Sequence, residues 1–571
     1  MNEVSSASPA DLYTRIERLA LATFAACARH GILPVAAVPT SLTIEKPKRK
    51  EHGDFAMTTC LSLARELKMS PRDLATGFLL HLDDAEGILE AAEIAGPGFI
   101  NFRIREAVWR DVIADVPRLG TTYGRSDIGA GKRVLVEFVS ANPTGPLHVG
   151  HGRGAVIGDA VASLLQAVGY TVEREYYIND VGNQMNILGR SLFVRYQQAC
   201  GLDVPFPENH YQGDYVLPIA QAFKAKHGDA YVLTDYETNR RFFIDFIKDD
   251  ILVGIKKDLG RLGVKFDRWF SEKSLHDQGR LLGVVERLKG AGVIKVDEEG
   301  RHVFLSTTLG DDEDRIVIRE NGVPTYFAAD IAYHEEKFER GYDHCINVWG
   351  ADHHGYIPRV KAAVSALGVD PERLEILLYQ FVSLVENGQQ VRMSTRTGQF
   401  ETLESLLEDV GEDVTRCTFL MRKSDSQFEF DLGLARTQSE DHPVFYVQFG
   451  HARICQIIEK AGREGYTVPR VDQTNLMALT LPEEMELIKK SLDYPEVLRA
   501  AAAVRGPHHI IFYLQELISQ FHTYYSKYAH SEKVVSSDAK KTSARLFLCD
   551  AVRIVVSNAL EVLGVSAPQR M

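Results

Sequence analysis

One pattern between residues 134 and 178 constrains the fold of this 571-residue chain more than any other feature. Residues 134–139 form a short apolar run, residues 155–168 place apolar side chains on one face of a helix that ends at Gly169, and residues 171–178 form a second strand-like run. A strand, a glycine-rich turn, a helix and a strand in this order form a parallel sheet with a right-handed crossover. Such sheets bind ligands at the carboxyl ends of their strands, so the pattern predicts a Rossmann-type domain with its site after residue 139.

The rest of the chain predicts a multidomain α/β protein. Residues 1–115 alternate helical and short apolar segments, which indicates an α+β N-terminal module, and a glycine-rich connection follows. We expect the Rossmann-type parallel-sheet domain over residues 125–400, with a mainly helical insertion at 190–300 and further strands at 302–305 and 316–318. The persistent helical pattern of residues 401–571 predicts an all-α C-terminal domain.

Composition narrows the class of protein. Apolar residues make up 45% and charged residues 25% of the chain, which is typical of a globular protein, and no apolar run approaches the roughly 18 residues that span a membrane. The seven cysteines are scattered without a C-x-x-C pair, which favours a reducing cytoplasm and argues against a cysteine-built zinc site. The net charge of −13 indicates no bulk attraction to nucleic acid, although residues 521–571 are locally basic. We expect a monomer.

The most informative motif lies in the turn between the first strand and its helix. His148 and His151 are three residues apart at the start of the helix, so both side chains can face one ligand. Their N–H groups, the free backbone N–H groups and the helix dipole together favour a phosphate. Gly150 and Gly152 carry no side chain, which would allow a base or ribose to approach the backbone.

Three other interpretations of this turn compete with a phosphate site. A dinucleotide fingerprint requires G-x-G-x-x-G, whereas Gly150, Gly152 and Gly154 are two residues apart. A zinc site would need a third ligand and a general base that the sequence does not identify. A structural turn with incidental histidines remains open from this stretch alone.

The wider sequence resembles one known family. His148-Val-Gly-His151 is similar to the His-x-Gly-His element of class I aminoacyl-tRNA synthetases, and further segments resemble the arginyl-tRNA synthetases among them, in family order from Glu51 onward. These segments are Glu137-Phe-Val-Ser-Ala-Asn142, Glu175-Tyr-Tyr-Ile-Asn-Asp-Val-Gly-Asn-Gln184, Thr325-Tyr-Phe-Ala-Ala-Asp-Ile-Ala-Tyr-His334, Trp349-Gly-Ala-Asp-His-His354, Asp441-His-Pro-Val-Phe-Tyr-Val-Gln448 with His451-Ala-Arg453, and Gly564-Val-Ser-Ala-Pro-Gln-Arg-Met571.

The resemblance implies an L-arginine site and an ATP site. Chemistry agrees with the first, because a planar guanidinium is matched by fixed carboxylates. Tyr326 and Asp330, which would share a helix face, match the family's guanidinium-binding pair, although the two alone would indicate only a surface pair. The implied arginine-binding residues are Glu137, Ser140, Asn142, His148, Tyr326, Asp330 and His354. The implied ATP-binding residues are Gly145, His148, Gly150, His151, Asp352, His353, Met393 and Ser394. Asp352 would accept from a ribose hydroxyl, with an ordinary helix cap as the alternative, and Mg²⁺ is expected on the ATP phosphates without a dedicated protein metal site.

A second nucleotide-binding loop departs from the class pattern. Where the class has Lys-Met-Ser-Lys-Ser, this chain has Arg392-Met393-Ser394-Thr-Arg396-Thr-Gly398. A cation is needed because charge builds up on the phosphates as pyrophosphate leaves. We expect Arg392 or Arg396 to supply it, with Lys132 as an additional candidate. The expected catalytic residues are His148, His151, Arg392, Met393, Ser394 and Arg396.

The resemblance also implies contacts with tRNA(Arg). Phe99 and Asn101 match the segment that contacts the outer corner of the tRNA, and Met571 matches a residue near the anticodon. Aromatic side chains among Phe449, Tyr524, Tyr525 and Tyr528, where exposed, could stack on anticodon bases.

The activity implied is ATP-dependent attachment of arginine to tRNA, through arginyl-adenylate and with bound tRNA required for activation. Two alternatives remain. A class I synthetase for another amino acid is disfavoured because an uncharged side chain would leave Glu137 and Asp330 unpaired. A catalytically silent tRNA-binding relative is supported only by the altered loop.

Overall fold

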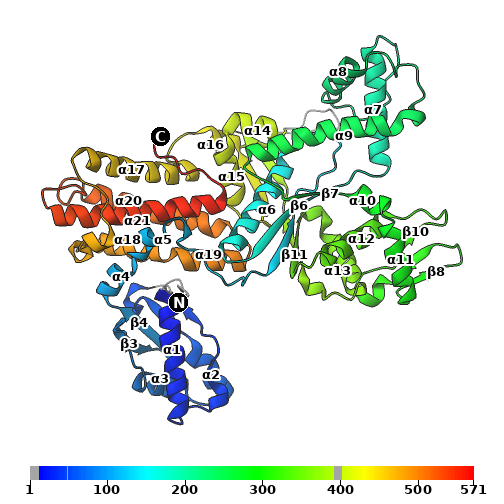
Figure 1. The fold of residues 1–571 in the computed structure, drawn as a ribbon. Helices are drawn as coiled ribbons and strands as arrows, with labels where there is room; N and C mark the ends of the chain where they lie inside the picture. Colours follow the sequence, from blue (N-terminus) through cyan, green and yellow to red (C-terminus); the bar gives the residue numbers. More distant parts are fainter. Residues whose placement is uncertain (1–11, 48, 387, 391–401) are drawn as a thin grey trace, which may run out of the picture.

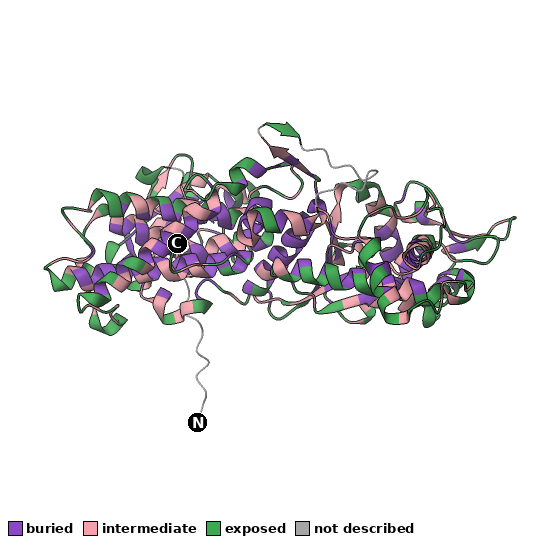
Figure 2. Cartoon of the chain, turned by 90° about the horizontal axis from the view of Figure 1, so that it is seen from above, coloured by how far each residue is buried: buried purple, intermediate pink, exposed green. Residues whose placement is uncertain are grey.

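The computed structural model describes residues 12–47, 49–386, 388–390 and 402–571. Figure 1 shows three regions: an N-terminal α+β module, a parallel-sheet domain, and a helical bundle that lies between the other two. The predicted multidomain α/β fold is therefore confirmed. The buried residues in Figure 2 follow the inner faces of the bundle helices and the parallel-sheet domain, while the outer faces are exposed.

The N-terminal module is an antiparallel sheet of strand order β1-β2-β4-β3 with helices packed against it. Along β4, Ile100 and Phe102 are buried, whereas Phe99 and Asn101 lie on the opposite, more open face, as the two-residue period of a strand requires. Ser70 caps α3 by accepting the Asp73 N–H. The elements are α1 (Leu12–Arg29), β1 (Ile44–Glu45), β2 (Phe55–Met57), α2 (Thr59–Leu67), α3 (Pro71–Leu80), β3 (Leu89–Ala95), β4 (Phe99–Ile104), α4 (Glu106–Val112) and α5 (Asp115–Leu119).

The five-stranded central sheet is parallel throughout, with strand order β12-β11-β5-β6-β7. Chain order reverses between β5 and β11, where Glu137 lies opposite Asn347. This switch point at the carboxyl ends of the strands is where a ligand crevice forms. The elements are β5 (Arg133–Glu137), α6 (Val149–Ala167), β6 (Thr171–Ile178), β7 (Arg268–Ser271), α10 (Glu272–Asp277), α11 (Arg280–Gly290), α12 (Tyr326–Glu339), β11 (His344–Gly350), α13 (Ile357–Ala366) and β12 (Leu374–Tyr379).

The region expected as a helical insertion contains a strand that the sequence analysis missed. Helices α7 (Asn183–Ala199), α8 (Val216–His227) and α9 (Tyr236–Arg261) form an arm beside the sheet, and the chain then returns as β7 at the sheet edge. The strands expected near 302 and 316 are present, but they belong to a separate antiparallel sheet of β8 (Ile294–Val296), β9 (His302–Phe304) and β10 (Arg315–Ile318). Strand β7, Arg268-Trp-Phe-Ser271, has only four residues and is too short to show the alternating pattern by which a strand is recognised from sequence.

The C-terminal part is helical, apart from β15 (Phe428–Asp431), which pairs with β13 (Val382–Glu386) beside β14 (Gln389–Gln390). Arg416 is buried where α6, α9 and α21 meet. It donates to Asp159 of α6 at 2.7 Å and to the Leu563 carbonyl at the end of α21 at 3.0 Å. The helices are α14 (Leu403–Val410), α15 (Glu412–Leu420), α16 (Leu432–Arg436), α17 (Pro443–Arg463), α18 (Pro482–Leu492), α19 (Tyr494–Ala503), α20 (His508–Lys527) and α21 (Ala539–Leu563).

Candidate active site

His148 and His151 form the N-terminal cap of α6. The His151 backbone N–H donates to His148 Nδ1 at 3.4 Å, and the His148 backbone N–H donates to His151 Nδ1 at 3.3 Å. The rings stack with centroids 3.6 Å apart. This reciprocal arrangement satisfies two backbone donors at the helix start and fixes both rings.

The capping geometry also assigns the protons. Burial lowers the pKa of His148, and burial together with the neighbouring His148 lowers the pKa of His151 to about 3. Both rings are therefore neutral at pH 7. Because each Nδ1 accepts a hydrogen bond, each ring carries its proton on Nε2 and can donate that proton to a ligand.

The glycines of this turn lie close to protein side chains. A side chain at Gly152 would lie 2.7 Å from Leu403 of α14, and one at Gly150 would lie 3.0 Å from the His148 ring. The expectation that Gly152 admits a base or ribose is therefore wrong, because protein atoms fill that space. Gly145 faces the ring of Tyr215, from which a side chain would be 3.3 Å away.

The chain leaves β5 through a strained turn. Val139 and Ser140 both have positive φ, +68° and +41°, a conformation that costs a non-glycine residue about 1–3 kcal/mol. Ser140 is held from two sides: its hydroxyl donates to Glu137 at 2.9 Å and accepts the Tyr177 N–H at 3.1 Å. Beyond the turn, the exposed Asn142 donates to Gln184 of α7 at 3.0 Å.

Glu137 is bound to a lysine that the sequence analysis missed. The ammonium group of Lys337 donates to Glu137 Oε2 and, at 2.8 Å, to Asn347 Oδ1. Burial acts to raise the pKa of Glu137, but attraction to Lys337 outweighs it and the pKa is lowered. Lys337 lies on the same face of α12 as Tyr326 and Asp330, seven residues after Asp330, and this helical spacing is the signal that could have identified it.

Asp330 lies in an acidic environment without such a partner. Its carboxylate accepts from the Tyr356 hydroxyl at 2.8 Å, and burial and then the charges of Glu272 and Glu137 raise its pKa to about 7. Glu272, which the sequence analysis also missed, is buried at the start of α10, and burial raises its pKa to about 7. In the described part of the chain, neither carboxylate forms an ion pair with a lysine or arginine.

Tyr326 is the first residue of α12 and is about half exposed. A side chain at Gly182, where φ is +95°, would lie 2.8 Å from the Tyr326 hydroxyl. Only glycine suits this position, since it needs both the left-handed conformation and the space beside the tyrosine.

Asp352, His353 and His354 lie in a 3₁₀ helix, Ala351–Tyr356, that follows β11. All three side chains are exposed at the carboxyl edge of the sheet, with His353 Nε2 3.7 Å from Asp352. Asp352 makes no capping bond, since the cap of this helix is Gly350. These residues are thus available to a ligand in the crevice.

Lys132 lies at the amino ends of the strands, whereas His148 follows their carboxyl ends, where pyrophosphate would be released. Lys132 immediately precedes β5 and lines a cavity of about 440 Å³ with Asp343, His344, Arg373 and Arg505, at the amino ends of the strands. The proposed assistance from Lys132 is therefore wrong, because β5 separates it from His148. Arg392, Met393, Ser394 and Arg396 lie outside the described residues.

The expected tRNA-contacting residues are far from this crevice. Phe99 and Asn101 are partly exposed on β4. Tyr525 and Met571 are exposed, and Phe449 is partly exposed on α17, whereas Tyr524 is buried and is not available for stacking.

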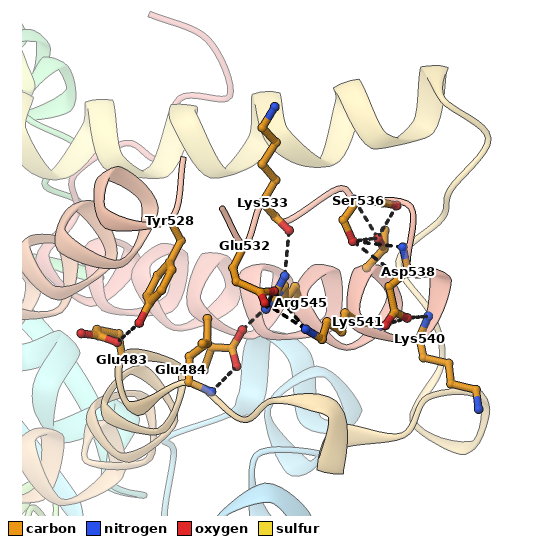
Figure 3. Close-up of polar contacts among 12 residues, drawn as sticks. Glu483, Glu484, Tyr528, Glu532, Lys533, Ser536, Asp538, Lys540, Lys541 and Arg545 are labelled. Atoms are coloured by element: carbon orange, nitrogen blue, oxygen red, sulfur yellow. Dashed lines mark hydrogen bonds and ion pairs between the residues drawn. The ribbon is translucent and has the colours of Figure 1, made fainter. Parts of the chain in front are cut away.

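Tyr525 lines a cavity of about 200 Å³ together with Lys460, Tyr528 and Lys533. Figure 3 shows how the wall of this cavity is held: Arg545 of α21 donates to Glu484 and Glu532, each at 2.7 Å, and to the Lys533 carbonyl at 2.9 Å. The Tyr528 hydroxyl donates to Glu483 at 2.8 Å. Arg545 and Glu484 are both buried, so this network fixes the loop that joins α20 to α21.

Two further observations concern the described residues. They contain no group of three histidine, cysteine, aspartate or glutamate side chains placed to hold a metal ion. None of their helices is long and apolar enough to cross a membrane.

Family models match three parts of the chain. They describe the N-terminal domain of arginyl-tRNA synthetase (residues 20–104), the catalytic domain of class I tRNA synthetases of the R type (119–428) and the DALR anticodon binding domain (447–571). The parallel sheet, its His148–His151 cap and the catalytic-domain match define a class I aminoacyl-tRNA synthetase.

Relatives that match along most of the chain show which amino-acid family within class I it belongs to. An arginine–tRNA ligase of Citrifermentans bemidjiense is 50% identical over 545 residues, 95% of this chain and 97% of the relative. One of Desulfitobacterium hafniense is 44% identical over 98% of this chain and all of the relative. The crystal structure of an arginyl-tRNA synthetase from Campylobacter jejuni superposes with a TM-score of 0.75 at 35% identity, covering 82% of this chain and all of that one. The chain belongs to the arginine–tRNA ligase family, which confirms the resemblance seen in the sequence.

Proposed function

We propose that the chain activates L-arginine with ATP and transfers the arginyl group to the terminal ribose of tRNA(Arg). The observation that carries the amino-acid specificity is the pair Asp330 and Glu272, two neighbouring buried carboxylates that form no ion pair with a lysine or arginine among the described side chains. The basic group nearest to Glu272 is His276, whose Nε2 lies 3.5 Å from the carboxylate. A bound guanidinium would supply a positive charge and could hydrogen-bond in bidentate fashion. The neutral side chain of another amino acid would leave both groups unpaired.

The nucleotide half of the site fits ATP. The carboxylate of arginine attacks the α-phosphate, and pyrophosphate leaves. His148 and His151 donate through Nε2 to the phosphates at the start of α6, where the helix dipole adds to their effect. Asp352, exposed at the end of β11, is proposed to accept from the ribose.

The remaining cation is proposed to come from the second loop, through Arg392 or Arg396, with Met393 and Ser394 beside the nucleotide. Mg²⁺ is proposed to arrive with the ATP phosphates and to neutralise part of their charge. Little proton transfer is required, so catalysis rests on positioning and on stabilisation of phosphate charge.

The tRNA is proposed to contact Phe99 and Asn101 at its outer corner and Phe449, Tyr525 and Met571 at its anticodon. A cytoplasmic location is supported by the seven cysteines, all of which lie in described parts of the chain as free thiols. A monomer is proposed because one chain carries all three modules.

Charging assays test this proposal. Purified protein is incubated with ATP, Mg²⁺, total tRNA and each radiolabelled amino acid in turn. The proposal expects acid-precipitable, base-labile label with arginine alone. Charging with another amino acid would favour a different class I specificity, and tRNA binding without any charging would favour a silent relative.

A further inference from the structure

Lys337 is the most completely enclosed cation near the proposed arginine pocket. It has no exposed surface, and its ammonium group meets three partners: Glu137, the Asn347 amide oxygen at 2.8 Å and the face of the Tyr333 ring, with 4.3 Å to the centroid. Asn347 in turn donates to His334 Nε2 at 3.1 Å. This network crosses the switch point between β5 and β11, where Glu137 lies opposite Asn347.

The network continues upward from Glu137 to the strained turn. The oxygen of Glu137 that does not contact Lys337 accepts from the Ser140 hydroxyl at 2.9 Å. Ser140 and Val139 hold left-handed conformations, which persist only where surrounding contacts enforce them. Asn142, two residues further on, is one of the residues proposed to contact arginine.

We propose that Lys337 is a positioning residue for the arginine site: its buried ammonium group fixes the Glu137 carboxylate, which through Ser140 holds the turn that presents Asn142. This inference rests on the proposed function. Lys337 itself is not expected to touch substrate, because its side chain has no exposed surface. Without the ammonium group Glu137 would be a buried carboxylate with no cation, and it would take up a proton and lose its fixed orientation.

The test compares two variants near the end of α12, in each of which a cationic side chain is replaced by methionine. Lys337→Met removes the cation under the turn. Arg340→Met, the matched control, removes a cation that binds buried Glu175 with two hydrogen bonds of 2.6 and 2.9 Å but makes no contact with Glu137. Both are expected to lower the melting temperature. Only Lys337→Met is expected to raise the arginine KM, by about tenfold or more, with the ATP KM within about twofold of wild type.

The pH dependence of the arginine KM distinguishes a positioning role from a general loss of stability. As the pH rises from 7 to 9, Glu137 of the Lys337→Met variant regains its charge, so the ratio of its arginine KM to that of wild type is expected to shrink. The ratio for Arg340→Met is expected to stay constant.

A double-variant cycle tests the route through Glu137. If Lys337 acts through that carboxylate, adding Lys337→Met to Glu137→Gln should change the arginine KM by less than about twofold. The double variant leaves neither buried charge unpaired, whereas each single variant leaves one. If a single variant does not fold, the double variant is compared with wild type, and an unchanged arginine KM there would also overturn the positioning role.

The positioning role would be overturned if folded Lys337→Met had an unchanged arginine KM. It would also be overturned if Lys337→Met raised the arginine KM equally in the wild-type protein and in Glu137→Gln. Absence of arginine-dependent activity in the wild type would instead overturn the proposed function.

Discussion

The two halves of the proposed active site are built in opposite ways. The nucleotide half uses His148 and His151, neighbours on one helix turn, both neutral and both fixed by backbone hydrogen bonds. The arginine half draws Glu137, Glu272 and Asp330 from the end of a strand and from two helices far apart in the chain. Phosphates require donors, which a helix start already supplies, whereas a guanidinium requires fixed negative charge that only tertiary structure can assemble.

The burial of charge follows the same division. The histidines avoid the cost of burial by remaining neutral. Glu137 remains charged because the neighbouring Lys337 lowers its pKa. Asp330 and Glu272 have no such neighbour, so burial raises their pKa values, and a bound cation would lower these values again. A substitution in one half should therefore change the kinetic constants for one substrate and leave those for the other nearly unchanged.

The largest effect is expected at the nucleotide half. His151→Ala removes the Nε2–H donor proposed for the phosphates and should lower the rate of ATP–pyrophosphate exchange by about a hundredfold or more, with the arginine KM little changed. His344→Ala, at the opposite edge of the same sheet, serves as the control and should have no comparable effect. Exchange by His151→Ala within threefold of wild type would remove the histidine from the mechanism.

The next effect separates the halves directly. Asp330→Asn should raise the arginine KM by about thirtyfold or more, since it removes the charged hydrogen-bond partner proposed for the guanidinium, and should leave the ATP KM unchanged. Asp352→Asn should show the reverse pattern, with a smaller rise in the ATP KM alone. Steady-state exchange kinetics with each substrate varied will show whether the effects separate. If each variant alters both constants equally, the division is wrong.

The arginine KM should depend on pH, whereas the ATP KM should not. Because the pKa values of Asp330 and Glu272 are raised to about 7, protonation weakens the pocket for a cation as the pH falls. The arginine KM should therefore be about tenfold higher at pH 6 than at pH 8. The histidines, whose pKa values are lowered, stay neutral over this range, so the ATP KM should remain flat. A constant arginine KM would show that these carboxylates do not hold the guanidinium.

The altered second loop is expected to contribute about a tenfold effect. Arg396→Ala removes a candidate cation for the leaving pyrophosphate and should lower the activation rate at least about tenfold at saturating substrates. Arg392→Ala tests the alternative. If both variants retain the wild-type rate, the loop does not supply the charge.

The smallest effect is expected at Lys132. Its position at the amino ends of the strands predicts that Lys132→Ala changes the exchange rate by less than about twofold. A tenfold loss would contradict the assigned geometry.

The difference between the halves also explains what the sequence could predict. The histidine motif, the sheet around it and the helical C-terminal domain depend on local spacing, and their fold was predicted correctly. Lys337 and Glu272 were missed because their roles arise only when α12 and α10 pack against β5 and β6. Gly152 was misinterpreted for the same reason, since Leu403, which occupies the space beside it, is about 250 residues away in the chain. Strand β7 escaped because four residues at a sheet edge carry little periodicity.

Arginine-dependent ATP–pyrophosphate exchange tests the central claim most directly, measured with and without tRNA and with the other amino acids as controls. We expect exchange with arginine alone, appearing only when tRNA is present. No exchange under either condition, with tRNA binding intact, would contradict the account and leave a tRNA-binding protein without catalytic activity.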